Sequence, residues 1–398
     1  MKGSLVKRSA GSWSIVLELD RDPAGKRRQK WITVAGRKKQ AEAELARLLH
    51  EVSSGAYVDP TRDTLATYLE RWLATVKPNL AGKTYERYRE VVEKHLTPAL
   101  GSTVLSKLRP MQIQQCYSLA LLSGRRPHPK REEDSTLEQP RGLSAQTVLH
   151  HHRILREALQ QAVRWQLLGR NPADAVEPPK PERREMRALN PAEMAWLLEV
   201  ARGTRFYVPL LLAISTGMRR GEFLAIQWPD VDLNTGMAAV NRSVEQTNEG
   251  IRFKSTKGRK GRSIILPPLT LEALREHRAQ QEQRKRTLGP AYDQGLICSR
   301  EDGSLWRPDT FSADFRALAR KAGIKVRLHD LRHSHATQLL AQGVHPKIVS
   351  ERLGHSTVAI TLDLYSHVLP GMQDEAVQKF DTALRAAIGV REQKAGRA

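Results

Sequence analysis

The second half of the chain carries five short groups of polar residues whose side chains could bind an anion and move protons. The first group, residues 216–224, places Arg219 and Glu222 three positions apart. At that spacing on a helix a guanidinium and a carboxylate lie on one face, and the acid can hold the arginine fork in place. Taken alone, such a pair is more often a surface ion pair.

The second group is a basic segment with two glycines, residues 253–262. Glycine supplies positive φ in a tight turn, so the segment predicts the tip of a β-hairpin, followed by a strand over 263–266. Its cations could hold DNA without sequence preference, and the candidates are Lys254, Lys257, Arg259 and Lys260. The segment lacks the pattern of a nucleotide-binding phosphate loop, so no nucleotide site is expected.

The third group is the run HDLRHSH, in which His329 and Arg332 fall on one face of a predicted helix. The acidic Asp330 suits the positive N-terminal end of that helix. A metal site built from His329, His333 and His335 would have no matching carboxylate or fourth ligand at a clear spacing. We therefore expect no metal.

The last two groups lie nearer the C-terminus. Gly354 is expected to end one helix and to leave His355 at an exposed corner, and Tyr365 lies on the next short helix. A single tyrosine among leucines is, on its own, more typical of a hydrophobic core. The order of all five groups, rather than any one of them, therefore indicates a shared site.

The net charge limits the kind of partner. The 398 residues include 65 Lys and Arg against 43 Asp and Glu, which gives a net charge of +22. Such an excess predicts a polyanionic partner, either nucleic acid or an anionic membrane. No stretch approaches the roughly 18 apolar residues of a membrane-spanning helix. The first residues also lack the apolar core of a secretory signal. We therefore expect double-stranded DNA as the partner and no membrane.

Cysteine usage indicates the compartment. The two cysteines, Cys116 and Cys298, are far apart and show no CxxC spacing. This excludes a disulfide scaffold and a zinc finger and favours a reducing cytosol.

Hydrophobic periodicity predicts a mainly α multidomain fold with small β-sheets. The expected parts are a small α+β module, a helical domain, a mixed but mostly α domain and a tail, over residues 1–57, 62–175, 188–385 and 386–398. Strands are expected over 13–19 and 30–34, and helices over 39–52, 65–73, 84–100, 111–122 and 145–168. In the third part we expect helices over 191–198 and 207–214, an antiparallel sheet from 236–244 and 263–266, and only helices from 308 onward.

Basic residues gather in the first part, and we expect DNA contacts from Arg27, Arg28, Lys30, Lys38 and Lys39. A small sheet backed by one helix could place a basic face in the major groove of DNA. The alternative is a small α+β domain whose charges are only solvated.

In type and order, the five groups resemble the tyrosine recombinase (phage integrase) family. The resemblance covers residues 189–368, and the first 55 residues resemble the arm-site-binding module of integrases from prophages and integrative elements. The catalytic residues that it implies are Arg219, Lys257, His329, Arg332, His355 and Tyr365, with Tyr365 as nucleophile. It also implies that Glu222 supports Arg219. Lys254 and Lys260 lie near Lys257 on the same hairpin, so the choice among the three lysines stays open.

The resemblance implies a site-specific recombinase that cleaves and rejoins DNA through a 3′-phosphotyrosyl bond. It implies no cofactor, a homotetramer on DNA attachment sites, accessory DNA-bending or directionality factors, and a place in the bacterial cytoplasm at the nucleoid. Two alternatives share much of the pattern: a nicking and closing enzyme similar to type IB topoisomerases, and a DNA-binding regulator without catalysis.

Overall fold

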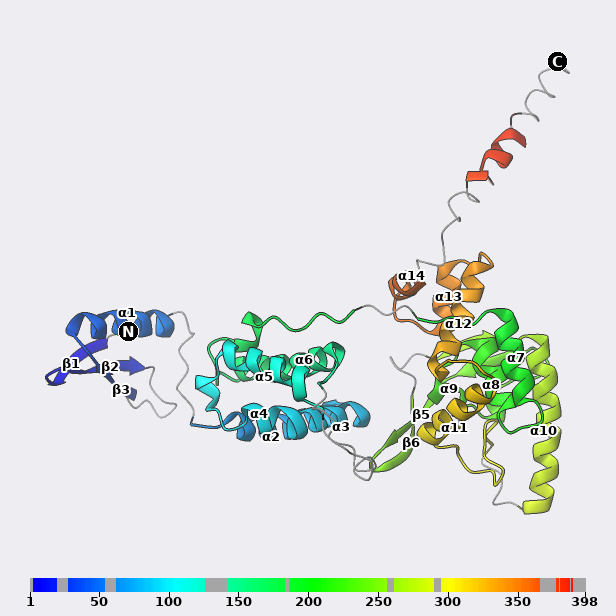
Figure 1. The fold of residues 1–398 in the computed structure, drawn as a ribbon, viewed down its shortest axis with the longest axis horizontal. Coiled ribbons are helices and arrows are strands. Elements are labelled where there is room, and N and C mark those ends of the chain that lie inside the picture. Colours follow the sequence, from blue (N-terminus) through cyan, green and yellow to red (C-terminus); the bar gives the residue numbers. More distant parts are fainter. Residues whose placement is uncertain are drawn as a thin grey trace. The chain divides into compact units, whose positions relative to one another are not determined.

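The computed structural model describes residues 3–19, 28–53, 62–125, 142–182, 186–255, 261–289, 295–365, 377–378, 380–386 and 388. The chain forms two compact units, residues 1–183 and 184–398. Both contain more helix than strand (Figure 1), so the expected mainly α class with small sheets is confirmed. Among the described residues, no helix is both long and apolar enough to cross a membrane.

The first unit begins with a three-stranded antiparallel sheet in the order β1-β2-β3, covered on one face by a helix. The elements are β1 (Gly3–Ser9), β2 (Ser12–Leu19), β3 (Arg28–Ala35) and α1 (Lys38–Ser53). Ile15 and Leu17 alternate on β2 and pack with Leu48 of α1 in a small core. β1 was not predicted. It is an edge strand whose residues are mostly exposed, so its hydrophobic alternation is weak.

The helices that follow share a separate core. They are α2 (Leu65–Val76), α3 (Gly82–Val91), α4 (Thr97–Leu100), α5 (Pro110–Ser123) and α6 (Ala145–Arg164), with 3-10 turns at Lys77–Asn79, Leu105–Lys107 and Pro172–Ala175. The single helix expected over 84–100 is divided by a π-helical turn, Val92–Leu96. Tyr68 and Trp72 of α2 are fully buried, and the Tyr68 hydroxyl donates to the Ala158 carbonyl at 2.5 Å.

α6 ends four residues earlier than the expected boundary at residue 168. Gln166 adopts a positive φ of 55°, and the Leu167 amide donates back to the Ala162 carbonyl at 2.8 Å. This closure satisfies carbonyls at the helix end and turns Leu168 into the core. The predicted helix end at residue 168 was wrong. The apolar periodicity continues to Leu168 because this residue also packs in the core, although it lies beyond the end of the helix.

The second unit contains most of the remaining helices. They are α7 (Pro191–Ala201), α8 (Tyr207–Thr216), α9 (Arg220–Phe223), α10 (Pro268–Leu288), α11 (Pro308–Lys321), α12 (Leu328–Ala341), α13 (Pro346–Leu353) and α14 (Val358–Tyr365), with a 3-10 turn at Trp228–Asp230. α8 is almost entirely buried and lies in the centre of the core. α10 was not predicted, because its sequence becomes almost wholly polar and charged after Leu274.

Two two-stranded antiparallel sheets replace the single sheet expected from 236–244 and 263–266. β4 (Met237–Val240) pairs with β7 (Arg262–Ile265), and β5 (Arg242–Thr247) pairs with β6 (Gly250–Ser255). The expected strand breaks at Asn241. Val240 and Val244 are both buried, so the alternation of buried and exposed residues is the same before and after Asn241. This pattern therefore gives no sign that the strand ends there.

Candidate active site

Two left-handed helix ends hold the most deeply buried arginine of the site. Gly217 ends α8 with φ 66°, and Gly354 ends α13 with φ 68°. Arg332 of α12 donates from Nη1 to the Gly217 carbonyl and from Nη2 to the Leu353 carbonyl, each at 2.8 Å. A Cβ on Gly217 would lie 2.6 Å from the Leu353 side chain, so both conformation and space require glycine there.

Arg219 contacts the same helix end as Arg332, at the carbonyl of the next residue, Gly354. The sequence predicted a helix that includes both Arg219 and Glu222. In the structure Arg219 lies one residue before the short helix α9, at its N-cap. Its Nη1 donates to Glu222 Oε1 at 2.9 Å, its backbone amide to Glu222 Oε2 at 2.9 Å, and its Nη2 to the Gly354 carbonyl at 3.1 Å. About a third of the side chain (34%) stays exposed, which leaves donors open for a ligand.

The buried carboxylate of Glu222 also binds a second arginine, Arg262, at 2.7 and 3.2 Å. Burial alone would raise the pKa of the Glu222 carboxyl. The hydrogen bonds and charges of Arg262 and Arg219 outweigh that effect, so the pKa is lowered and the group is ionised near neutral pH. Arg262 was not among the predicted site residues. The only signal for it in the sequence is its place at the start of the strand after the basic hairpin tip.

His355 follows Gly354 directly and is half-buried. Its Nδ1 lies 2.8 Å from Thr361 Oγ1. Burial, followed by the charges of Arg332 and Arg219, lowers the pKa of His355 to about 4, so its ring is neutral at pH 7. A neutral imidazole near these two arginines can form a hydrogen bond to a phosphate oxygen without transferring a proton to it.

His329 lies one helical turn before Arg332 on α12. Its ring helps to line a cavity of about 270 Å³. The other lining residues are Met218, Arg220, Ser312, Leu328 and Arg332. The His333 ring packs edge-on against the His329 ring at 4.8 Å. Partial burial and the charge of Arg332 lower the pKa of His329. The neutral form, which can accept a proton, is therefore favoured.

The nucleophile candidate is placed only by its backbone. Tyr365 is the last residue of α14, a helix that packs against α12 and α13. Its side chain lies outside the described part of the structure. Lys257, Arg259 and Lys260 lie in residues 256–260, also outside it, between the ends of β6 and β7. Lys254 of β6 is described, and its Nζ pairs with Glu245 at 2.6 Å.

The N-terminal candidates do not form one basic sheet face within the described residues. Arg27 is not described, and only the backbone of Arg28 is. Lys30 shares the β3 face of Ile32, which packs against α1, so it lies on the covered side of the sheet. Lys38 pairs with Glu42 on α1 at 3.4 Å, and Lys39 is exposed next to it. The open face instead presents Trp31, which is 53% exposed and was not among the predicted DNA contacts.

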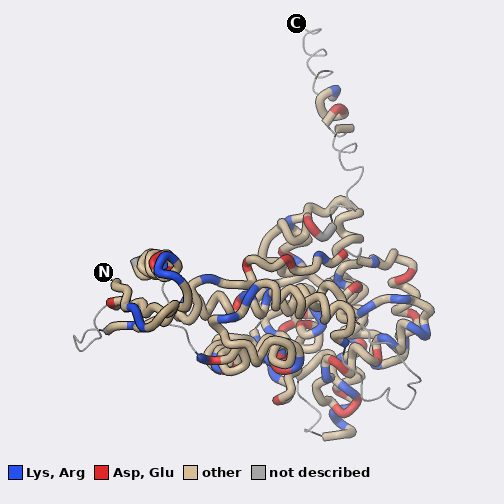
Figure 2. Tube along the Cα trace, turned by 60° about the vertical axis from the view of Figure 1, so that its left-hand side comes forward, with Lys and Arg blue, Asp and Glu red and all other residues tan. Residues whose placement is uncertain are grey.

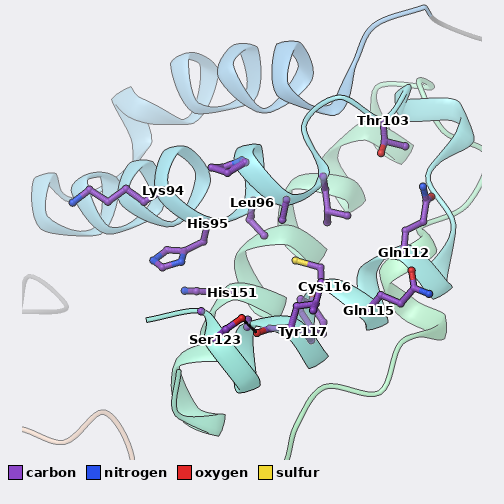
Figure 3. Close-up of a pocket in the computed structure, with 16 residues that line it drawn as sticks. Lys94, His95, Leu96, Thr103, Gln112, Gln115, Cys116, Tyr117, Ser123 and His151 are labelled. Atoms are coloured by element: carbon purple, nitrogen blue, oxygen red, sulfur yellow. Dashed lines mark hydrogen bonds between the residues drawn. The ribbon is translucent and has the colours of Figure 1, made fainter. Parts of the chain in front are cut away.

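A further cavity, of about 550 Å³, lies in the helical part of the first unit (Figure 3). His95 and His151 face each other there with ring centroids 4.5 Å apart, and Cys116 lies in the same wall. Burial lowers the pKa of His151 to about 4, so it is neutral at pH 7. Of the predicted catalytic residues whose side chains the structure describes, none lines this cavity. No group of three or more His, Cys, Asp or Glu side chains in the described chain could hold a metal ion.

Comparison with known proteins places this chain in a family. The model of the phage integrase family matches residues 187–371, and that of the phage integrase N-terminal SAM-like domain matches residues 64–119. A tyrosine recombinase XerC-like protein of Caldanaerobacter subterraneus is 27% identical over 95% of this chain and 97% of its own length. The ICEBs1 integrase of Bacillus subtilis is 24% identical over 96% of this chain and 100% of its own length.

Solved structures share the fold. The Tn1549 transposon integrase in complex with a circular intermediate DNA superposes with a TM-score of 0.65 at 17% identity, over 80% of this chain and 99% of that chain. A lambda integrase dimer bound to a core site gives 0.55 at 17% identity, over 90% of this chain and 93% of that chain. The chain belongs to the phage integrase family of tyrosine recombinases, enzymes that cleave and rejoin DNA. The resemblance seen in the sequence is therefore confirmed.

Proposed function

We propose that this chain is the site-specific integrase of a phage or other mobile element and that Tyr365 is its nucleophile. One observation supports the proposal most strongly. Arg219, Arg332 and His355 come from separate segments and meet at the corner formed by Gly354. Such a cluster of cations and a neutral imidazole suits a phosphodiester, whose non-bridging oxygens gain charge during in-line attack.

The two arginines would bind those oxygens. A guanidinium has a planar fork of donors that matches phosphate geometry, and both forks here are fixed by backbone carbonyls or by Glu222. They therefore stabilise the transition state without having to reorganise. His355 would donate a further hydrogen bond to the phosphate.

Proton transfer would involve the remaining residues. A tyrosine hydroxyl has a reference pKa of about 10, so it needs a base or a positive field to attack at pH 7. His329, with its lowered pKa, is the proposed base. Tyr365 Oη would bond to phosphorus as the bond to the 5′ oxygen breaks, and a lysine of the hairpin would give that oxygen its proton. Lys257 is the proposed donor.

The 3′-phosphotyrosyl product keeps the energy of the phosphoester bond. The 5′ hydroxyl of a second duplex can therefore reverse the attack and join new partners, without ATP. We propose that four protomers assemble on DNA for this exchange, together with accessory DNA-bending or directionality factors. We also propose that the reaction takes place at the nucleoid in the bacterial cytoplasm.

The experiment that separates this function from its alternatives uses two duplexes of different length that carry the attachment sites. A recombinase joins strands between the duplexes. A topoisomerase-like enzyme relaxes or reseals one duplex and yields no joint product, and a regulator without catalysis binds DNA and cleaves neither. EDTA should have no effect on joint products.

Salt should weaken DNA binding steeply. The net charge is +22, and Lys and Arg occur along both units (Figure 2). Each phosphate that is neutralised releases counterions, so with roughly 8 contacts the plot of log affinity against log salt should have a slope near −7. Fluorescence anisotropy with a labelled duplex measures this. A slope shallower than about −2 would contradict contacts along the whole chain.

Deletion of residues 1–57 should separate two activities. The sheet and α1 have a core of their own, distinct from the core of α2 to α6, so the remaining parts should still fold. We propose that this module binds distal arm sites. The truncated protein should therefore cleave an isolated core site at a normal rate but fail to recombine full attachment sites. Normal recombination of full sites by the truncated protein would show that the arm-binding assignment is wrong.

A further inference from the structure

Arg262 is bound at the centre of the candidate site although no role is assigned to it. It is the first residue of β7, and its side chain is only 12% exposed. Its two Nη atoms bind both oxygens of Glu222, and its Nε donates to the Arg352 carbonyl at 2.8 Å. Its stem passes close to Gly354, where an added Cβ would lie 2.9 Å from Arg262 Nη1. Arg262 therefore contacts both Glu222 and the C-terminal end of α13, at Arg352 and Gly354, directly before His355.

A reciprocal bond fixes the strand to the same helix. Arg352 of α13 donates from Nη1 to the carbonyl of Ile265, the last residue of β7, at 3.0 Å. Its Nη2 donates to the Ser215 carbonyl at 2.9 Å, and its Nε to His335 Nε2 at 3.1 Å. Burial lowers the pKa of His335 to about 4, so this ring is a neutral acceptor. β7 is therefore tied to α13 at both of its ends, and α13 is tied to α8.

We propose that Arg262 is a positioning residue for DNA cleavage: through Glu222 it holds Arg219 in register with the corner of Gly354 and His355. This inference rests on the proposed function. Arg262 is also the second described residue after the segment that contains Lys257. The same bonds therefore fix the start of β7 beside the arginines that are proposed to bind the phosphate.

Charge explains why one carboxylate is shared by two arginines. A lone pair of Arg219 and Glu222 would be neutral, and Arg219 would attract a phosphate only weakly. With Arg262 the group of three carries a net charge of +1, while Glu222 accepts a hydrogen bond from each of four donors. A buried carboxylate that loses two of its donors becomes less well fixed and is easier to protonate. Arg219 then loses its support.

The test compares Arg262→Met and Arg262→Lys with the wild type on a nicked suicide substrate. The rate of covalent adduct formation is measured at saturating DNA, together with DNA affinity and thermal unfolding. Because small misplacements at a reacting centre can cost about 100-fold in rate, Arg262→Met should slow adduct formation by about 10- to 100-fold. DNA affinity should change less than about threefold, since the Arg262 side chain is mostly buried and is not proposed to contact DNA. Arg262→Lys keeps the charge but not the fork, so it should recover part of the rate.

The matched control is Arg242→Met. Arg242 begins β5 in the same unit and also gives two bonds to one carboxylate, that of Asp230, at 2.7 and 2.8 Å. This variant loses an equivalent ion pair and should keep the adduct rate within about threefold. The double variant of Arg262→Met with Glu222→Gln should be hardly slower than the slower single variant, because the two residues act as one unit.

Two results would overturn the inference while leaving the proposed function intact. One is an adduct rate for Arg262→Met within about twofold of the wild type. The other has two parts. The decreases in adduct rate of the two single variants multiply in the double variant, and each decrease is proportional to the loss of thermal stability, as expected for a purely structural residue. If Arg262→Met does not fold, the rate of Arg262→Lys decides in the same way. A wild-type protein that formed no adduct would overturn the proposed function, and this inference with it.

Discussion

Tyr365→Phe should bind DNA as tightly as the wild type and form no covalent adduct with it. The change removes one oxygen and keeps the ring, so DNA binding should change little, but phenylalanine offers no nucleophile. On a nicked suicide substrate the wild type should trap a protein–DNA adduct that survives denaturing electrophoresis, without added metal or ATP. The mutant should show none.

The matched control for this experiment is Tyr207→Phe. Tyr207 is the first residue of α8, and its ring lies 5.7 Å from the Arg202 guanidinium, a contact that phenylalanine can keep. The control should form the adduct at the wild-type rate. If Tyr365→Phe also formed it at that rate, the nucleophile would be another residue.

Arg332→Met should lower the rate of adduct formation by about 100- to 1,000-fold, the usual loss when one fixed donor to a transition-state oxyanion is removed. Arg332→Lys should recover little of this rate. A lysine ammonium cannot replace the planar guanidinium, whose two Nη atoms donate to the Gly217 and Leu353 carbonyls. The rate is measured at saturating DNA on the same nicked substrate, so that weaker binding does not contribute.

Stability must be measured with that rate, because Arg332 is 4% exposed and its loss leaves the Gly217 and Leu353 carbonyls without this donor. Unsatisfied buried groups cost about 1–3 kcal/mol each, so Arg332→Met should unfold at a lower temperature. Arg242→Met is again the control for the loss of an arginine with two hydrogen bonds. A rate for folded Arg332→Met within about fivefold of the wild type would contradict the proposed role in phosphate binding.

Local spacing was enough to predict the parts of the site that lie within one segment. Arg219 and Glu222 are three residues apart, and their contact is local. His329 and Arg332 share a face of α12 for the same reason, and the glycine at 354 predicts the end of α13. Such features depend on the geometry of helices and of their N-caps and on the conformational freedom of glycine, which a sequence states directly.

Features that depend on contacts between distant segments were not predictable in this way. Arg262 binds a carboxylate 40 residues earlier in the chain, and nothing in its local sequence indicates that partner. The exposed ring of Trp31 and the covered position of Lys30 depend on which sheet face α1 occupies. The break at Asn241 was missed because Val240 and Val244 keep the same alternation on both sides of it.

Tyr365 should become bound to DNA through its phenolic oxygen, and mapping the adduct identifies the residue that carries this bond. The trapped wild-type complex is digested with nuclease and protease, and the modified peptide is identified by mass spectrometry. The expected result is a phosphotyrosyl bond on Tyr365, attached to the 3′ end of the cleaved strand, and a free 5′ hydroxyl on the released strand. A bond on another residue, or one to a 5′ phosphate, would contradict it.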